Sequence, residues 1–251
     1  MDEYQNYYQL CVVCSVQENE DLEIYIQTLE PLSLSVIPVS KEIVQIQALF
    51  FEEKKTPGLT DVSWTVLSED MWNQPDVVTI NGLKLQCPKT VFGHGDHPTT
   101  QLCQEILRDC SLTSESHLID VGTGSGVLSF LAWQRGVSSI EAFDIDPFAI
   151  ATARQNARDN TIPEEMFSVS DLFDWQPQKK ADVLIANLPI DILERAFDRL
   201  RDWVILDGLM IVSGLTTTWA SQFEASLGPS VSIVKKKILD EWGCYLLKVN
   251  F

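Results

Sequence analysis

The sequence predicts an α/β protein with a doubly wound, mostly parallel seven-stranded sheet, a C-terminal antiparallel hairpin and a small N-terminal α+β (β-α-β-β) domain. Three observations support this prediction. Between residues 118 and 215, apolar runs of strand length alternate with amphipathic segments of helix length. The last two apolar runs meet at Asp240-Glu-Trp-Gly243, a turn that makes them antiparallel. Residues 4–51 have the pattern of a strand, a helix and two further strands.

The N-terminal domain is expected to span residues 1–60. Alternating apolar residues predict strands at 4–16, 32–38 and 42–51, and apolar residues at helical spacing predict a helix over 18–29. Ten acidic residues and three lysines make this stretch strongly negative. Such a surface favours a basic partner through electrostatic complementarity.

Residues 61–90 are assigned to a linker and a hairpin, and residues 91–251 to the main domain. The hairpin is expected because two short apolar runs flank Asn81-Gly82, a pair that suits a tight two-residue turn. Pro98 and Pro147 are placed to begin two helices, since proline suits the first helical position. The strands expected in the main domain are 118–122, 140–146, 166–170, 181–187 and 209–215.

Composition and charge exclude several classes of protein. A net charge of −18 would repel nucleic-acid phosphates, so direct binding of nucleic acid is not expected. No apolar run reaches the roughly 18 residues of a membrane span, and the first residues lack the pattern of a signal peptide. A cytoplasmic protein without membrane contact is therefore expected. The six cysteines show no framework spacing and are expected to be reduced.

The stretch Leu118–Val127 is the most informative part of the chain. It predicts a buried strand, a turn with glycines at positions 122, 124 and 126, and the start of a helix. Glycine permits a sharp turn and the close approach of a ligand to the backbone. The G-x-G-x-x-G pattern of dinucleotide-binding proteins would need glycine where Val127 stands. The turn therefore predicts a site for a nucleoside-containing cofactor without a pyrophosphate.

Polar residues at the ends of the predicted strands extend this site, because ligands bind outside the carboxyl ends of parallel strands. They are Asp120, Asp144, Asp171 and Asn187. Asp144 follows the first glycine by 22 positions (144 − 122), the spacing at which a carboxylate reaches a ribose diol. Asp146 and Asp171 are explained equally well as a helix cap and a turn residue.

A polar loop precedes the helix that begins at Pro98. Its glycines make it flexible, and we expect it to cover the bound cofactor as a lid. The lid residues are Phe92, Gly93, His94, Gly95 and His97. A metal ion is not expected at His94 and His97, because Pro98 restricts the preceding backbone and the chain has three histidines in all.

Four segments resemble the PrmA family of bacterial methyltransferases, which modify the eleventh protein of the large ribosomal subunit. They are Phe92-Gly-His-Gly-Asp-His-Pro-Thr-Thr100, Ile119-Asp-Val-Gly-Thr-Gly-Ser-Gly-Val-Leu128, Phe143-Asp-Ile-Asp-Pro-Phe-Ala-Ile150 and Val183-Leu-Ile-Ala-Asn-Leu188. The resemblance covers about residues 70–251, whereas the N-terminal domain resembles the family's substrate-recognition domain only loosely. It implies a Rossmann-like methyltransferase sheet.

The resemblance also implies S-adenosyl-L-methionine as cofactor, with a lysine side chain or the N-terminus of a ribosomal protein as methyl acceptor. Thr100, Gly122, Asp144 and Asn187 match the family's binding positions. Combined with the strand-end residues, the expected cofactor-binding set is Thr100, Asp120, Gly122, Gly124, Gly126, Asp144, Asp171 and Asn187. The residues expected to place the acceptor amine are Asn187, Thr99 and Thr100.

Three departures from the family pattern keep other interpretations open. His94 replaces a threonine of the lid, Asn187-Leu-Pro189 replaces a turn usually written N-I-L, and the N-terminal domain is read as lacking a second helix and a final strand. One alternative is an amino-group methyltransferase with a different protein or small-molecule acceptor. The other is a catalytically inactive module that binds S-adenosylmethionine.

Overall fold

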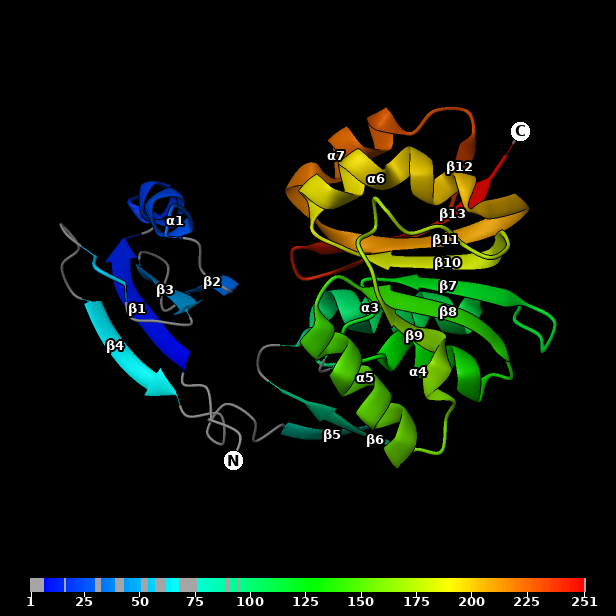
Figure 1. The fold of residues 1–251 in the computed structure, drawn as a ribbon. Coiled ribbons are helices and arrows are strands. Elements are labelled where there is room, and N and C mark those ends of the chain that lie inside the picture. The colour runs from blue at the N-terminus through cyan, green and yellow to red at the C-terminus, as the bar shows by residue number, and fades with distance from the viewer. Residues whose placement is uncertain are drawn as a thin grey trace. The chain divides into compact units, whose positions relative to one another are not determined.

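The computed structural model divides the chain into two compact units, Met1–Pro75 and Asp76–Phe251 (Figure 1). The structure describes residues 7–15, 17–29, 33–38, 43–50, 54–56, 62–67, 76–88, 91–93 and 95–250. Each unit has a hydrophobic core of its own, as separate domains do. Among the described helices, none has the length and apolarity needed to cross a membrane.

The first unit contains a four-stranded antiparallel sheet and a described helix. Its elements are β1 (Tyr7–Ser15), α1 (Asn19–Gln27), β2 (Ser33–Pro38), β3 (Ile43–Phe50) and β4 (Val62–Leu67). The strand order is β2-β3-β1-β4. Alternate residues of β1 and β3 point to one face and pack with α1. The buried residues of this core are Leu10, Val12, Ile26, Ile46 and Ala48.

Strand β4 differs from the sequence prediction. Val62–Leu67 lies in the stretch 61–90 that was expected to be linker and hairpin, yet it pairs with β1 from Tyr7↔Leu67 to Val12↔Val62. A short alternating run of this kind is stabilised as a strand mainly by its cross-strand neighbours. The sheet therefore has one strand more than the three that the sequence analysis expects in this domain.

The second unit contains the seven-stranded sheet. Its elements are β5 (Asp76–Ile80), β6 (Leu83–Cys87), α3 (Pro98–Asp109), β7 (His117–Val121), α4 (Val127–Gln134), β8 (Ser139–Asp144), α5 (Pro147–Asp159), η1 (Glu164–Met166), β9 (Phe167–Val169), β10 (Ala181–Asn187), α6 (Ile190–Asp202), β11 (Val204–Thr216), α7 (Thr217–Ser226), β12 (Val231–Leu239) and β13 (Trp242–Val249). The order is β12-β13-β11-β10-β7-β8-β9, with β13 antiparallel to both neighbours. The predicted doubly wound, mostly parallel sheet with a closing hairpin is confirmed.

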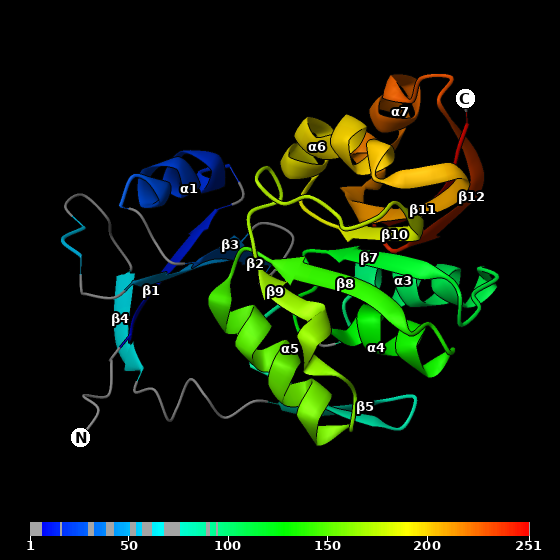
Figure 2. The same ribbon diagram turned by 45° about the vertical axis from the view of Figure 1, so that its right-hand side comes forward.

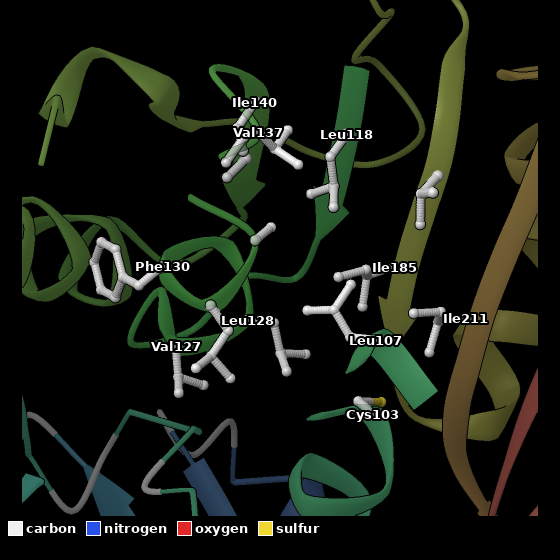
Figure 3. Packing of buried hydrophobic residues seen from close by; sticks show 14 of the residues in the cluster. Cys103, Leu107, Leu118, Val127, Leu128, Phe130, Val137, Ile140, Ile185 and Ile211 are labelled. Atoms are coloured by element: carbon white, nitrogen blue, oxygen red, sulfur yellow. The ribbon is translucent and has the colours of Figure 1, made fainter. Parts of the chain in front are cut away.

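Helices cover both faces of this sheet (Figures 1 and 2), with α3, α4 and α5 on one face and α6 and α7 on the other. On the first face, Leu107 of α3 and Phe130 of α4 belong to one core with the strand residues Leu118, Ile140 and Ile185 (Figure 3). A second core lies under α6 and α7. Because both faces are covered, the central strands are apolar along most of their length.

Local sequence signals predict one tight turn and the starts of two helices. Asn81 and Gly82 have φ angles of 49° and 83° in the turn between β5 and β6, as a tight hairpin requires. Pro98 and Pro147 begin α3 and α5, as predicted.

Two asparagines of α5 fasten this hairpin. Asn156 Oδ1 accepts a hydrogen bond from Gln86 N (2.7 Å), and its Nδ2 donates to Gln86 O and Ser125 O (3.0 Å each). One turn later, Asn160 bonds in the same way to the backbone N and O of Lys84. The two side chains satisfy backbone groups of β6 that a neighbouring strand would otherwise bind.

Candidate active site

A cavity of about 820 Å³ opens at the carboxyl ends of the parallel strands of the second unit. Its lining comes from the ends of β7, β8 and β10, the residues after β9, the loop before α3, and parts of α6, β11 and β13. This is where a doubly wound sheet binds ligands. The volume suits a cofactor of nucleoside size.

The glycine turn forms one side of the cavity. Gly122 lines it with a φ of 68°, and a Cβ at this position would lie 2.6 Å from Leu188 Cδ2. Gly124, with a φ of 55°, lies against the loop before α3, where a Cβ would come within 2.3 Å of the carbonyl oxygen of Phe92. Gly126 caps α4. Of these three glycines, Gly122 lines the cavity, and the other two shape the turn.

Asp120 lies beneath the glycine turn. It is 1% exposed and accepts hydrogen bonds from Thr123 Oγ1 (2.8 Å) and Ser129 Oγ (2.6 Å). Burial raises the pKa of this carboxyl, and the hydroxyl donors oppose that shift. Because successive residues of a strand point to opposite sides, its neighbour Val121 lines the cavity. In the structure, these two hydroxyl groups hold the carboxylate of Asp120 beneath the turn, and its predicted contact with a cofactor stays a prediction.

Asp144 ends β8 and lines the cavity. Its Oδ2 accepts a hydrogen bond from Gly124 N, and its Oδ1 accepts one from Asp146 N, both at 3.0 Å. A carboxylate has about four lone-pair sites, so sites remain for a ligand's hydroxyl groups. Burial raises the pKa of Asp144, against the effect of these N–H donors. Asp146 instead caps α5 by accepting a hydrogen bond from Phe148 N (2.8 Å).

Asp171 and Asn187 complete the polar wall of the cavity. Asp171 Oδ1 accepts a hydrogen bond from Phe173 N (2.8 Å), so this residue shapes a turn as well as lining the cavity. Asn187 ends β10, and its side-chain amide makes no hydrogen bond within the described part of the chain. The structure thus brings Gly122, Asp144, Asp171 and Asn187 together around one cavity.

The expected lid is anchored where it begins. Ser125 N donates to Phe92 O (2.9 Å), and Ser125 Oγ donates to Gly93 O (2.7 Å). Phe92 and His97 line the cavity. His94 lies outside the described residues. The glycine turn therefore holds the first residues of this loop. We still expect the loop to cover a bound cofactor, which stays a prediction.

The two threonines at the start of α3 differ in position. Thr99 lines the cavity, whereas Thr100 Oγ1 is buried without a hydrogen-bond partner in the described structure. His97 caps the helix, since its Nδ1 accepts from Thr99 N (3.3 Å) and lies 2.8 Å from Thr99 Oγ1. A backbone N–H only donates, so Nδ1 carries no proton and the neutral ring holds its proton on Nε2.

Several cavity residues escaped the sequence analysis. Arg195 Cζ lies 4.9 Å from the ring centroid of Phe173, and both line the cavity. Gly214 also lines it with a φ of 97°, and a Cβ there would lie 1.9 Å from the carbonyl oxygen of Leu188. A glycine inside an apolar strand is a usable signal of close backbone approach. Arg195, Phe173 and Trp242 also line the cavity, and they have no comparable local signal.

Comparison with known proteins assigns the second unit to one family. Residues 72–250 match the family described as "Ribosomal protein L11 methyltransferase (PrmA)". The ribosomal protein L11 methyltransferase of Anoxybacillus flavithermus is 28% identical over 237 residues, which cover 91% of this chain and 75% of that protein. Other relatives of the same name are matched over 40% to 52% of their length, so the chain spans about half the length of these proteins.

Solved structures agree with this match. The ribosomal protein L11 methylase of Lactobacillus delbrueckii subsp. bulgaricus aligns with a TM-score of 0.59 and 28% identity, covering 64% of this chain and 82% of that one. A putative methyltransferase, SMU.776, solved in complex with SAH, aligns with a TM-score of 0.55 over 70% of this chain and 56% of its own. At 15% identity, the second likeness concerns the fold alone.

Proposed function

The chain belongs to the PrmA family of ribosomal protein L11 methyltransferases, and on this premise we propose that it methylates amino groups of a large-subunit ribosomal protein, using S-adenosylmethionine. The acceptors are lysine side chains, the N-terminus, or both. The observation that carries the proposal is a single cavity in which Gly122, Asp144 and Asn187 meet at the ends of three adjacent parallel strands.

The residues around the cavity fit S-adenosylmethionine. Asp144 has lone pairs left for the two ribose hydroxyls, and Gly122 leaves the backbone open to close approach. Ile145 and Phe173 would offer apolar surface to the adenine ring, and Asp171 would accept a hydrogen bond from its amino group; all three line the cavity. Bound there, S-adenosylmethionine would supply the methyl group of its sulfonium.

The protein's own contribution is positioning. Methyl transfer is an in-line displacement, so the acceptor nitrogen must aim its lone pair at the methyl group. The side-chain oxygen of Asn187 and the backbone at Leu188 would hold the hydrogens of the amine, with Thr99 beside them. His97 cannot take the amine's proton at Nδ1 without giving up the cap of α3, so the proton passes to water.

Substrate recognition falls to the first unit in this proposal. Its acidic composition suits a basic ribosomal protein, and neither unit is expected to bind nucleic acid directly. Thr100 and the lid residues Phe92 to His97 would enclose the methionine part of the cofactor. The protein would act in the cytoplasm, where ribosomal proteins are made.

Mass spectrometry of bacterial ribosomal protein L11 after incubation with the enzyme and S-adenosylmethionine tests the proposal. Methyl groups should appear on its amines. Asn187→Ala should lower turnover by about a hundredfold even when the cofactor is saturating, because the amine is no longer aligned. Full turnover of this variant with normal cofactor affinity would refute the assigned role.

Pro189 on the cavity wall favours a second candidate, in which the acceptor is another protein or a small amine. The turn Asn187-Leu-Pro189 departs from the family's pattern and lies where the acceptor would enter. Transfer of tritiated methyl groups into lysate proteins, with none into ribosomal protein L11, would support it. Calorimetric binding of the cofactor without transfer to any acceptor would instead indicate an inactive module.

A further inference from the structure

Three aromatic rings meet on the cavity wall, and none of them holds the acceptor in the mechanism proposed above. Phe92, His97 and Trp242 all line the cavity. The ring of His97 lies 5.0 Å from that of Phe92 and 5.2 Å from that of Trp242, with interplanar angles of 63° and 62°. Both contacts are edge-to-face, so His97 joins the other two rings into one aromatic stretch of the cavity wall. Phe92 is 48% exposed, which leaves its ring accessible to a ligand.

The charges around these rings favour a cation. Asp96 and Glu241 are exposed and act electrostatically on His97. Burial lowers the pKa of the His97 ring and so favours its neutral form, which also accepts the capping hydrogen bond, although Asp96 and Glu241 oppose this shift. The cationic Arg195 lies over the ring of Phe173, which follows β9 at one edge of the sheet, whereas Trp242 begins β13 near the opposite edge.

Methyl transfer changes what can recognise the acceptor. Each transfer breaks the S–CH3 bond, whose electron pair stays on sulfur, and forms an N–CH3 bond with the lone pair of nitrogen. The resulting ammonium releases a proton to water before it can accept another methyl group. Each added methyl group removes an N–H that Asn187 could bind and spreads the positive charge over a surface that aromatic faces attract.

We propose that Phe92, His97 and Trp242 form an aromatic cage for the methylated ammonium group of the acceptor. The inference rests on the proposed function and adds a second mode of recognition to it. Asn187 binds an amine that still has hydrogens, and the cage binds one whose hydrogens have been replaced. The cage takes N-methylated ammonium in preference to an uncharged group of the same shape.

Calorimetry with choline and its uncharged carbon isostere, 3,3-dimethylbutan-1-ol, tests the cage without any transfer step. With S-adenosylhomocysteine bound, the full-length protein should bind choline roughly tenfold more tightly than the isostere. Trp242→Leu and Phe92→Leu should remove this preference, whereas Trp242→Phe should keep most of it. Equal binding of the two probes by the unmodified protein, or an unchanged preference in both leucine variants, would overturn the proposal.

A second readout applies once transfer to an acceptor is established. Trp242→Leu should shift the products on ribosomal protein L11 towards monomethylated amines, while Trp242→Phe keeps the original distribution. An unchanged distribution in Trp242→Leu would count against the cage. Absence of methyl transfer would refute the proposed function. The cage could still be tested, because the choline assay needs no acceptor protein.

Discussion

Two aspartates two positions apart have separate tasks, which one substitution at each can distinguish. Asp144 lines the cavity, and Asp146 caps α5. Asp144→Asn removes the charge that would accept the ribose hydrogen bonds. Because hydrogen bonds to a charged group contribute about 1.5–3 kcal/mol, the affinity for S-adenosylmethionine should fall by about 10- to 100-fold. Calorimetric titration of the cofactor measures this change.

Asp146→Asn is the matched control. Asparagine caps helices about as well as aspartate, so both cofactor affinity and stability should stay close to those of the unmodified protein. Equal losses of cofactor affinity in the two variants would show that the affinity does not depend on the place of Asp144 in the cavity wall.

His117 predicts how stability depends on pH. It is 2% exposed at the start of β7, with Nε2 2.9 Å from Glu141 Oε1 and Nδ1 2.9 Å from Ser139 Oγ. Burial lowers the pKa of His117, and this outweighs the attraction of Glu141. The unfolded chain then binds more protons than the folded one, so the free energy of unfolding should fall as pH drops below about 6.5.

Urea unfolding between about pH 8 and about pH 5 measures this loss. His117→Gln lacks the titrating ring, so its free energy of unfolding should fall less steeply over the same range. The comparison isolates His117 because both proteins share every carboxylate that titrates in this window. Identical pH profiles would mean that the buried ring does not contribute.

At the scale of elements, the hairpin β5–β6 depends on α5. Asn156→Ala would leave Gln86 N, Gln86 O and Ser125 O without partners, at a cost of about 2–4 kcal/mol. Asn160→Ala removes equivalent bonds to Lys84, but water can replace them there, so the cost should be about 1 kcal/mol or less. Denaturant unfolding compares the two variants. If Asn160→Ala lowered the free energy of unfolding as much as Asn156→Ala, burial of the Asn156 hydrogen bonds would not explain the cost.

Elements whose signals are local could be predicted from the sequence. Asn81-Gly82 specifies its turn by backbone chemistry alone. Asp144, Asp171 and Asn187 are expected close together because parallel strands end at one edge of the sheet, and all three line the cavity. Strand β4 was missed because its partner β1 lies far away in the chain. The hydrogen bond from Ser129 Oγ to Asp120 joins residues nine positions apart and has no local signal in the sequence. Trp242 meets His97 only because β13 inserts beside β11.

At the scale of the whole molecule, the two units should divide binding of the cofactor from recognition of the substrate. The described residues that line the cavity belong to the second unit, and the first unit has its own core. If the proposed division holds, removing Met1–Pro75 should keep cofactor affinity within about threefold and abolish methylation of ribosomal protein L11, because the acidic residues proposed to attract the substrate are removed. The cut follows Pro75, since a cut at residue 60 would leave β4 without β1.

Calorimetry with S-adenosylmethionine and mass spectrometry of the ribosomal protein measure the two effects on the same preparation. A truncated protein that binds the cofactor normally and still methylates the substrate at the original rate would place recognition in the second unit. Loss of cofactor binding as well would mean that the cavity depends on the first unit. If the truncated protein binds the cofactor normally but transfers no methyl group, substrate recognition is assigned to the acidic first unit. Charge complementarity acts on the encounter between the two proteins and leaves the contacts of the cofactor unchanged.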